Sequence, residues 1–396
     1  MNTHHTVRPG LVFAESVLPG HPDKLADQVA DALVDIALQQ DPRAIVQIEV
    51  AVHDRRCHVN GRLSTAGAPL DRHYVEATVR GVFERAGFGV PFEPIGHGTD
   101  YACPLPVDVE VDLACTIDEA DPAERDLREL TDDQAIHIGY AVGTPETHWL
   151  PIEQHLASRL REALLALLVN DRSLGGGPDG KLLLALRPAG QGAGGLTRWA
   201  PAWVITSVQH LEAAPTVVLE RAVRRCFTQR LEEEAARMPA LLEPPGPDFV
   251  VRFNEAGPFV EGGPMNDNGQ TGRKLVMDFY GPRVAIGGGA LSGKDPWRLD
   301  RAAALRTRQI AVAMVATGFV HEARVTFAWG PRDARPSGVV LEADGRVLDD
   351  ATTARWLNRF DPNLAASHAE LGLAQVNWEN CARAGHFGRD LPWERG

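Results

Sequence analysis

The chain has 396 residues, of which 44% are hydrophobic and 23% are charged, and its formal net charge at pH 7 is −13. This length allows two or three domains. The negative net charge argues against nucleic acid or an anionic membrane as a partner. No segment has the apolar length of a membrane span. The five cysteines fit neither a disulfide framework nor a zinc site, and the first ten residues do not resemble a secretory signal, so we expect a cytoplasmic protein.

Strand pairs alternate with helices along the chain. In chain order, the hydrophobic pattern first predicts a helix over 21–41, a hairpin over 44–65, and helices over 71–86 and 151–170. A strand pair at KLLLAL and AWVITSVQH, a helix over 216–236 and the short segments FVVRF and KLVMDFY follow. The last predicted elements are a helix over 298–317, strands at EARVTFAWG and GVVLEAD, and a final helix near 350–360. Paired strands indicate α+β layers with antiparallel sheets rather than a doubly wound parallel sheet. The linker or mobile-loop candidates are 100–131 and 241–248.

Three glycine-rich patterns resemble nucleotide-binding loops without meeting their full requirements. GQGAGG (190–195) fits G-x-G-x-x-G, but it joins two predicted antiparallel strands and opens no helix. GGGPDGK (175–181) and GGALSGKD (288–295) fit G-x-x-x-x-G-K, but Leu182 and Asp295 stand where a P-loop has Ser or Thr. Glycine-rich backbone beside a lysine nevertheless suits phosphate.

Basic and acidic residues gather in three short segments, against the acidic background of the chain. These residues are His21, Asp23 and Lys24 at the start of the first predicted helix, Asp267, Arg273 and Lys274 in NDNGQTGRKLVMD, and Lys294, Asp295, Arg298, Asp300 and Arg301 in GGGALSGKDPWRLDR. Lysine and arginine can hold a polyphosphate, and aspartate can hold the magnesium that accompanies it. Asp27, Asp31 and Asp35 continue an i, i+4 stripe from Asp23, which predicts the solvent-exposed face of the helix.

Taken together, these motifs make the chain resemble the methionine adenosyltransferase (S-adenosylmethionine synthetase) family. The resemblance is carried, in similar order and spacing, by ESVLPGHPDKLADQ, PDGK (178–181), GGPMNDNGQTGRK (262–274), GGGALSGKDPWRLDR (287–301) and GHFGRDLPWE (385–394). It implies an α+β fold of three similar α/β subdomains, with mixed or antiparallel sheets around a pseudo-threefold axis. The expected divisions are a central subdomain of 14–110 and 262–301, an N-terminal one of 1–13 and 140–261, and a C-terminal one of 111–139 and 302–396.

The resemblance also implies a reaction and an assembly. Methionine sulfur attacks C5′ of ATP and displaces the intact triphosphate, which is then hydrolysed to pyrophosphate and phosphate, with the help of two Mg²⁺ ions and one K⁺. The expected assembly is a homodimer, or a dimer of dimers, with active sites shared between subunits. Carried over residue by residue, the roles are triphosphate binding by His21, Lys181, Arg273, Lys274 and Lys294, contacts to ribose or the amino acid by Asp179 and Asp267, adenine stacking by Phe259, a nucleotide pocket lined by Ala290, magnesium binding by Asp23 and Asp300, and potassium binding by Glu49.

The chain departs from the family pattern mainly at the expected acceptor end, where the candidate residues are Arg62, Asp133, Asp267 and Arg298. Arg62 stands where the family has a glutamate, Arg298 replaces a lysine, Pro258 replaces an arginine, DDQA (132–135) replaces GDQG, and the usual lid has no counterpart in 109–130. An arginine in place of a glutamate disfavours an ammonium group, so Arg62→Glu is expected to improve the use of methionine.

Two alternatives to methionine adenosylation therefore stay open. The first is a divergent enzyme that uses another thioether or thiol, or that only hydrolyses triphosphate. The second is a catalytically silent regulatory subunit, which the retained charges argue against, because an idle site has no need to keep so many of them.

Overall fold

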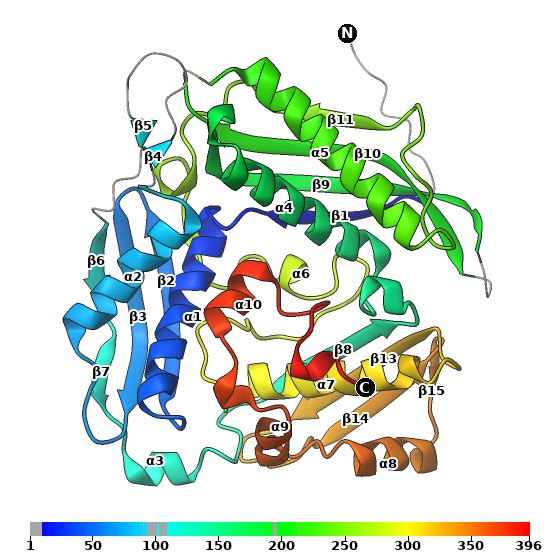
Figure 1. The fold of residues 1–396 in the computed structure, drawn as a ribbon. Helices are drawn as coiled ribbons and strands as arrows, with labels where there is room; N and C mark the ends of the chain where they lie inside the picture. Colours follow the sequence, from blue (N-terminus) through cyan, green and yellow to red (C-terminus); the bar gives the residue numbers. More distant parts are fainter. Residues whose placement is uncertain (1–9, 90, 93–100, 103–108, 193–195, 213) are drawn as a thin grey trace.

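The computed structural model describes residues 10–89, 91–92, 101–102, 109–192, 196–212 and 214–396. Residues 1–9, Cys103 and residues 193–195, the second half of the GQGAGG segment, lie outside the described residues. The first sheet has the order β1-β9-β10-β11 (Figure 1). Its strands are β1 (Val12–Val17), β9 (Gly176–Gln191), β10 (Thr197–His210) and β11 (Val250–Phe253). Helices α4 (Ile152–Asn170) and α5 (Thr216–Arg237) cover it and share a separate apolar core with it.

The second sheet has the order β12-β2-β3-β6, and β7 also pairs with β3. Its strands are β12 (Gly269–Gln270), β2 (Ile45–His53), β3 (Arg56–Thr65), β6 (Glu110–Leu113) and β7 (Thr116–Glu119). Helices α1 (Pro22–Gln40) and α2 (Arg72–Ala86) pack on one face. The predicted hairpin is confirmed, because β2 and β3 pair antiparallel over their full length.

The third sheet is antiparallel, with the order β15-β14-β13-β8. Its strands are β8 (Ala135–Val142), β13 (Glu322–Trp329), β14 (Gly338–Ala343) and β15 (Arg346–Val347). The covering helix α7 (Leu299–Ala316) packs on β8 and β13. Helices α8 (Asp350–Arg359), α9 (Leu364–Glu370) and α10 (Trp378–Ala384) follow, so the prediction that the helix near 350–360 is the last one is wrong.

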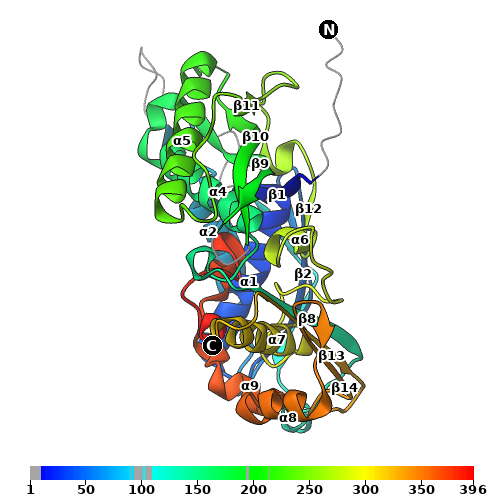
Figure 2. The same ribbon diagram turned by 90° about the vertical axis from the view of Figure 1, so that its right-hand side faces the viewer.

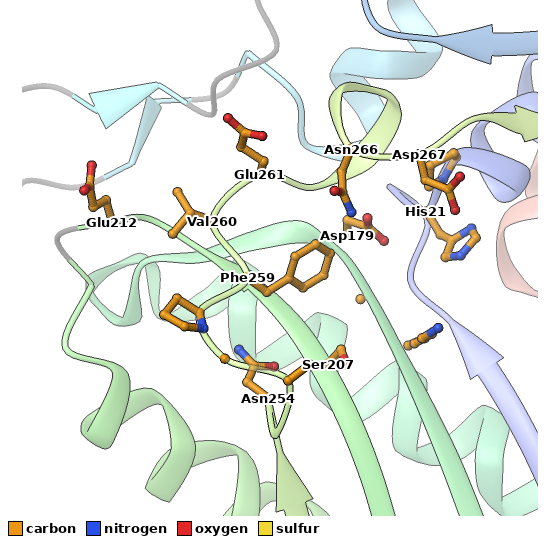
Figure 3. A pocket seen from close by; sticks show the side chains of 16 residues that line it. His21, Asp179, Ser207, Glu212, Asn254, Phe259, Val260, Glu261, Asn266 and Asp267 are labelled. Atoms are coloured by element: carbon orange, nitrogen blue, oxygen red, sulfur yellow. The ribbon is translucent and has the colours of Figure 1, made fainter.

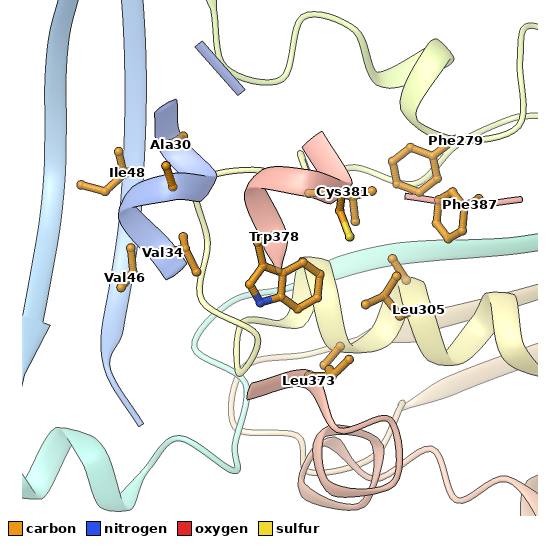
Figure 4. Close-up of a cluster of buried hydrophobic side chains, with 14 of the residues drawn as sticks. Ala30, Val34, Val46, Ile48, Phe279, Leu305, Leu373, Trp378, Cys381 and Phe387 are labelled. Atoms are coloured by element: carbon orange, nitrogen blue, oxygen red, sulfur yellow. The ribbon is translucent and has the colours of Figure 1, made fainter. Parts of the chain in front are cut away.

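One apolar core joins the second and third sheets. Figure 4 shows Val34 of α1, Ile48 of β2, Leu305 of α7 and Trp378 of α10 around it. In the side view of Figure 2, helices α4 and α5 lie on the left of the molecule, and strands β2, β8, β13 and β14 lie on the right. The predicted α+β class with mixed or antiparallel sheets is confirmed. The subdomain boundaries stay a prediction, because sheet membership does not divide the chain into folding units.

Three local predictions are wrong. Asp27 and Asp31 are fully buried and Asp35 is partly buried, so the aspartate stripe of α1 is no solvent-exposed face; its carboxylates accept backbone N–H groups from other segments. The described part of 100–131 forms ordered edge strands and the short helix α3 (Pro122–Asp126). Segment 241–248 is no linker, since Leu241 and Glu243 bond to the backbone of Trp199 at 2.8 Å.

The segment KLVMDFY forms the short helix α6 (Leu275–Asp278) and its C-terminal turn, whereas FVVRF forms strand β11. The lysine that precedes α6 and the loop before it belong to the candidate site, so this short helix fixes the end of a functional loop.

Candidate active site

The His21 group lies where the first sheet meets the start of α1. We use this name for the predicted site residues His21, Asp23, Asp179, Lys181, Phe259, Asp267, Arg273 and Lys274. A cavity of about 760 Å³ is lined by five of them, His21, Asp179, Lys181, Phe259 and Asp267. Figure 3 shows most of these side chains around the cavity, together with Asn254 and Ser207. Strand β9 supplies Asp179 and Lys181, and the loop after β11 supplies Phe259 and Asp267.

His21 caps the N-terminus of α1. Its Nδ1 accepts a hydrogen bond from the backbone N–H of Asp23 at 3.2 Å, and Pro22 follows at the first helical position. Burial, followed by the charge of Lys274, lowers the pKa of His21 to about 4. The imidazole is therefore neutral at pH 7, and because Nδ1 accepts, Nε2 carries the proton and can donate a hydrogen bond.

Asp23 connects the start of α1 to the loop that carries two of the predicted cations. Lys274 Nζ lies 2.6 Å from one carboxylate oxygen, Arg273 lies 3.5 Å from the other, and the N–H of Gln270 donates to it at 3.1 Å. Burial raises the pKa of Asp23, but the hydrogen bonds from Lys274 and from the N–H of Gln270 lower it by a larger amount. The net shift of the pKa is downward. Asp23 is thus an ionised hard-oxygen donor.

Asp179 and Lys181 have different environments on β9. Asp179 accepts a hydrogen bond from the N–H of Gly263 at 2.8 Å, and burial raises its pKa to about 6. Lys181 is exposed at the cavity, and its ammonium group has no ion pair within the described residues. A cation without a counter-charge beside a cavity is suited to an anionic ligand. The backbone of Phe259 is held by His210 through two hydrogen bonds of 2.9 and 3.2 Å.

The Lys294 group lies on the second sheet and at the start of α7. We use this name for the predicted site residues Glu49, Arg62, Asp133, Ala290, Lys294, Arg298 and Asp300. The end of loop 287–295 runs along β2 like an added strand: the N–H of Ile48 donates to Gly293 at 2.7 Å, and Asp295 accepts from Val46 at 2.8 Å. Gly293 is required here, because its φ is +82° and a Cβ would lie 2.1 Å from the carbonyl oxygen of Ile48.

This strand-like packing places Lys294 beside Asp300. The two form an ion pair, and Asp300 also accepts from His137 Nε2 at 3.3 Å. Glu49 lies on the exposed face of β2, two residues from Gln47, whose backbone forms a bridge with Lys294. Ala290 lies against the loop of the other group, since a Cβ on Gly272 would lie 2.7 Å from the Ala290 Cβ.

The expected acceptor end contains matched charges. Arg62 NH1 lies 2.7 Å from Glu124, and its Nε lies 3.4 Å from Asp118. Arg298 forms an ion pair with Asp132. Asp133, the residue predicted for this role, is exposed, and its carboxylate accepts from the adjacent N–H of Gln134.

Arg62, Arg298 and Asp300 are close enough to affect one another electrostatically. Burial, followed by the charge of Arg128, lowers the pKa of Arg298 to about 10, and the charges of Asp300 and Arg62 also act on it. Arg62, Arg298 and Asp300 therefore share one electrostatic neighbourhood. Asp267, which was predicted to contact both substrates, lies with the His21 group instead.

Within one chain, the two groups approach each other through Ala290 and Gly272, but their polar side chains are separate. Among the described residues, no hydrogen bond or ion pair joins the His21 group to the Lys294 group, and the cavity of Figure 3 is lined only by the first. The described residues also contain no cluster of three or more His, Cys, Asp or Glu side chains able to hold a metal ion. Asp23 and Asp300 each offer one carboxylate, which fits Mg²⁺, because this ion keeps several waters and phosphate oxygens as ligands.

Several contacts were missed by the sequence analysis. They involve His137 beside Asp300, Asp118 and Glu124 beside Arg62, and Asp132 beside Arg298. A histidine inside the apolar strand pattern AIHIGYAV is a detectable signal, because a buried polar side chain needs a partner. The acidic residues gave no comparable signal, since segment 109–130 is rich in them.

Comparison with known proteins gives the family of the chain. Residues 10–93 match the family described as S-adenosylmethionine synthetase, N-terminal domain, and residues 261–395 match its C-terminal domain. S-adenosylmethionine synthase from Prochlorococcus marinus (strain MIT 9313) is 34% identical over 96% of this chain and 93% of the relative. The proteins of the same name from Corynebacterium urealyticum and Synechococcus sp. (strain CC9902) are 32% and 33% identical, over 97% and 96% of this chain and 96% and 95% of the relatives. Because this similarity spans almost the whole chain, the chain belongs to the S-adenosylmethionine synthetase family.

Proposed function

We propose that this chain transfers the adenosyl group of ATP to the sulfur of methionine. The sulfur lone pair forms a bond to C5′, the bond from C5′ to the triphosphate oxygen breaks, and its electron pair leaves with the intact triphosphate. Water then hydrolyses the triphosphate to pyrophosphate and phosphate. The observation that carries this proposal is a cavity of nucleotide size. Its wall holds a neutral histidine and a lysine that has no ion pair among the described residues.

The residues of the His21 group suit a displacement with a highly charged leaving group. Such a reaction is accelerated mainly by cations and hydrogen-bond donors fixed in advance around the departing oxygens. Lys181 and Lys274 supply positive charge, and the Nε2–H of His21 is free to donate to the leaving oxygen. A thioether sulfur carries no proton, so the step needs no general base, and none of the proposed roles is that of a base.

Magnesium, when bound, would neutralise charge on the triphosphate. We propose that Asp23, at the start of α1, and Asp300, at the start of α7, each hold one such ion, and that Glu49 binds K⁺. In this structure Asp23 faces Lys274, and Asp300 faces Lys294. Each lysine would then turn toward the phosphates when ions and nucleotide enter together.

The ion pairs of Arg62 support methionine as the acceptor. Arg62 with Asp118 and Glu124 is a cluster of one cation and two carboxylates, so its formal charge is −1, the same as that of the single glutamate expected there. The reversal of charge that suggested another acceptor is thus compensated by neighbouring residues. An ammonium group still meets net negative charge at this end of the site.

We also propose that two copies of the chain form each active site together. Each site would take the His21 group from one subunit and the Lys294 group from its partner, because the two groups are not joined within one chain. Helices α1 and α2 cover one face of the second sheet, while Gln47, Glu49 and Asn60 are exposed on its other face. This open face is where we place the subunit contact.

A product analysis tests the reaction. The purified chain is incubated with ATP, Mg²⁺ and K⁺, with and without methionine, and S-adenosylmethionine, triphosphate, pyrophosphate and phosphate are measured. We expect S-adenosylmethionine, pyrophosphate and phosphate in equal amounts, and only in the presence of methionine. Triphosphate cleavage without an adenosyl product would contradict the proposal, and so would adenosyl transfer to another thioether in preference to methionine. Lys181→Ala is the matched inactive control, with an expected loss of about 10²–10³-fold in kcat.

A further inference from the structure

His137 is a buried polar side chain on β8 that the proposed reaction does not use. It is 3% exposed, and its Nε2 lies 3.3 Å from Asp300 Oδ1. Its cross-strand partner on β13 is the fully buried, apolar Phe327. A polar ring buried in such a setting is costly unless it forms a hydrogen bond. The contact with Asp300 is the hydrogen bond that the structure provides.

The direction of this hydrogen bond follows from the state of Asp300. Burial raises the pKa of this carboxyl, but the hydrogen bond with His137 and the charge of Lys294 lower it to about 2. An ionised carboxylate only accepts hydrogen bonds, so His137 Nε2 is the donor. Nδ1 has no hydrogen-bond partner among the described residues. The hydrogen bond to Asp300 is therefore the one that the described residues provide for this ring.

Both oxygens of the Asp300 carboxylate are held, and the chain around them is closely packed. Oδ2 pairs with Lys294, while Oδ1 faces His137. A glycine-rich loop crosses directly over the pair: a Cβ on Gly289 would lie 1.9 Å from Oδ1, and a Cβ on Gly287 would lie 2.1 Å from the carbonyl oxygen of Ile136. No larger residue fits this crossing without moving β8 or Asp300.

We propose that His137 is a positioning residue for Asp300. By donating to Oδ1 it fixes the rotation of the carboxylate, so that its remaining lone pairs keep one orientation toward the divalent cation that accompanies the triphosphate. The proposal rests on the proposed function, in which Asp300 is a magnesium ligand. Hydrogen bonds that orient a metal ligand in this way typically change metal affinity by about 10–100-fold.

Three variants of one residue test this role in the full chain. His137→Leu removes the donor, His137→Asn keeps a polar group that is too short to reach Asp300, and His137→Gln places an amide N–H near the position of Nε2. The measurement is the Mg²⁺ concentration needed for half-maximal binding of a non-hydrolysable ATP analogue, determined by calorimetry. We expect the Leu and Asn variants to need about tenfold more Mg²⁺, the Gln variant to stay within about threefold of the unchanged chain, and the KM for methionine to stay the same in all three.

A neighbouring variant separates positioning from a structural role. Ile138→Ala changes the same strand on the opposite face, and it should leave the Mg²⁺ dependence unchanged while lowering the melting temperature. If the Leu and Asn variants need no more Mg²⁺ than the unchanged chain, or if Ile138→Ala causes the same increase, the proposal is overturned. Should the Leu variant fail to fold, the Mg²⁺ concentrations needed by the Asn and Gln variants are compared instead, and equal values for these two variants would overturn the proposal. A chain that itself binds no analogue in the presence of Mg²⁺ would overturn the proposed function, and the role of His137 with it.

Discussion

At the scale of single residues, the charge of a side chain matters less than the charges that surround it. Arg62 reverses the sign of the residue expected at its position, but Glu124 and Asp118 lie 2.7 and 3.4 Å from its guanidinium. Ser64 donates to Asp118 as well, which holds β7 against β3 at this point. The arginine is therefore part of a local charge pattern, and changing it alone disturbs both carboxylates.

The structure reverses the expected effect of Arg62→Glu. The substitution would bring a third carboxylate beside Asp118 and Glu124, at a cost of about 1 kcal/mol for each like-charged contact at this partly exposed position. We expect a lower melting temperature and a higher KM for methionine, measured by calorimetry and by initial rates.

The charge-swapped double variant Arg62→Glu with Glu124→Arg is the matched control for that prediction. It restores one ion pair, and we expect it to recover part of the lost stability. An Arg62→Glu enzyme that is as stable as the unchanged chain and uses methionine better would show that the compensation by Asp118 and Glu124 is absent.

At the scale of elements, the row of aspartates on α1 holds the segments 271–274 and 287–295, which carry predicted site residues. Asp27 accepts from the N–H of Gly272 at 2.8 Å, and Asp31 accepts from the N–H of Gly293 at 2.8 Å. One turn further on, the two oxygens of Asp35 accept from the first N–H groups of α10, both at 2.9 Å. The i, i+4 spacing of a helix thus sets the spacing of three segments that are far apart in the sequence.

Two substitutions on this row should differ in cost. Asp31 pairs with Arg301, and both side chains are fully buried, so Asp31→Ala leaves an unpaired buried cation and should lower the free energy of unfolding by about 3–5 kcal/mol. Asp35→Ala removes a helix cap and should cost about 0.5–2 kcal/mol. Thermal unfolding of the two variants beside the unchanged chain tests this order, and equal losses would contradict it.

The same row shows what the sequence could and could not predict. The helix itself was predictable from its apolar spacing and its capping residues. Most of the predicted site residues lie in short contiguous motifs, and their roles stay predictions. The burial of Asp27 and Asp31 was not predictable. Residues at the same helical spacing can form either a solvent-exposed face or a face that contacts loops. Their partners lie 245 and 262 residues away along the chain. Likewise, Glu124 is 62 residues from Arg62, and no local pattern connects them.

At the scale of the whole molecule, the two groups of predicted site residues lie at the starts of different helices. His21 and Asp23 lie at the start of α1, which packs on the second sheet, and Asp300 lies at the start of α7, which packs on the third (Figure 2). Lys181 lies at the cavity of the His21 group, whereas Lys294 pairs with Asp300 at the start of α7. If each active site takes one group from each of two subunits, lesions in different groups should complement each other.

Purified mixed dimers test this sharing. We expect homodimers of Lys181→Ala and of Lys294→Ala to be at least about 100-fold less active than the unchanged enzyme. A mixed dimer of the two, isolated through two different affinity tags, has one doubly damaged site and one intact site, so it should show about half of the unchanged activity. The reverse pairing is the control: a subunit with both substitutions beside an unchanged subunit damages both shared sites and should be inactive. Sites contained within single chains would give the opposite result in both mixtures, with an inactive first dimer and a half-active second one.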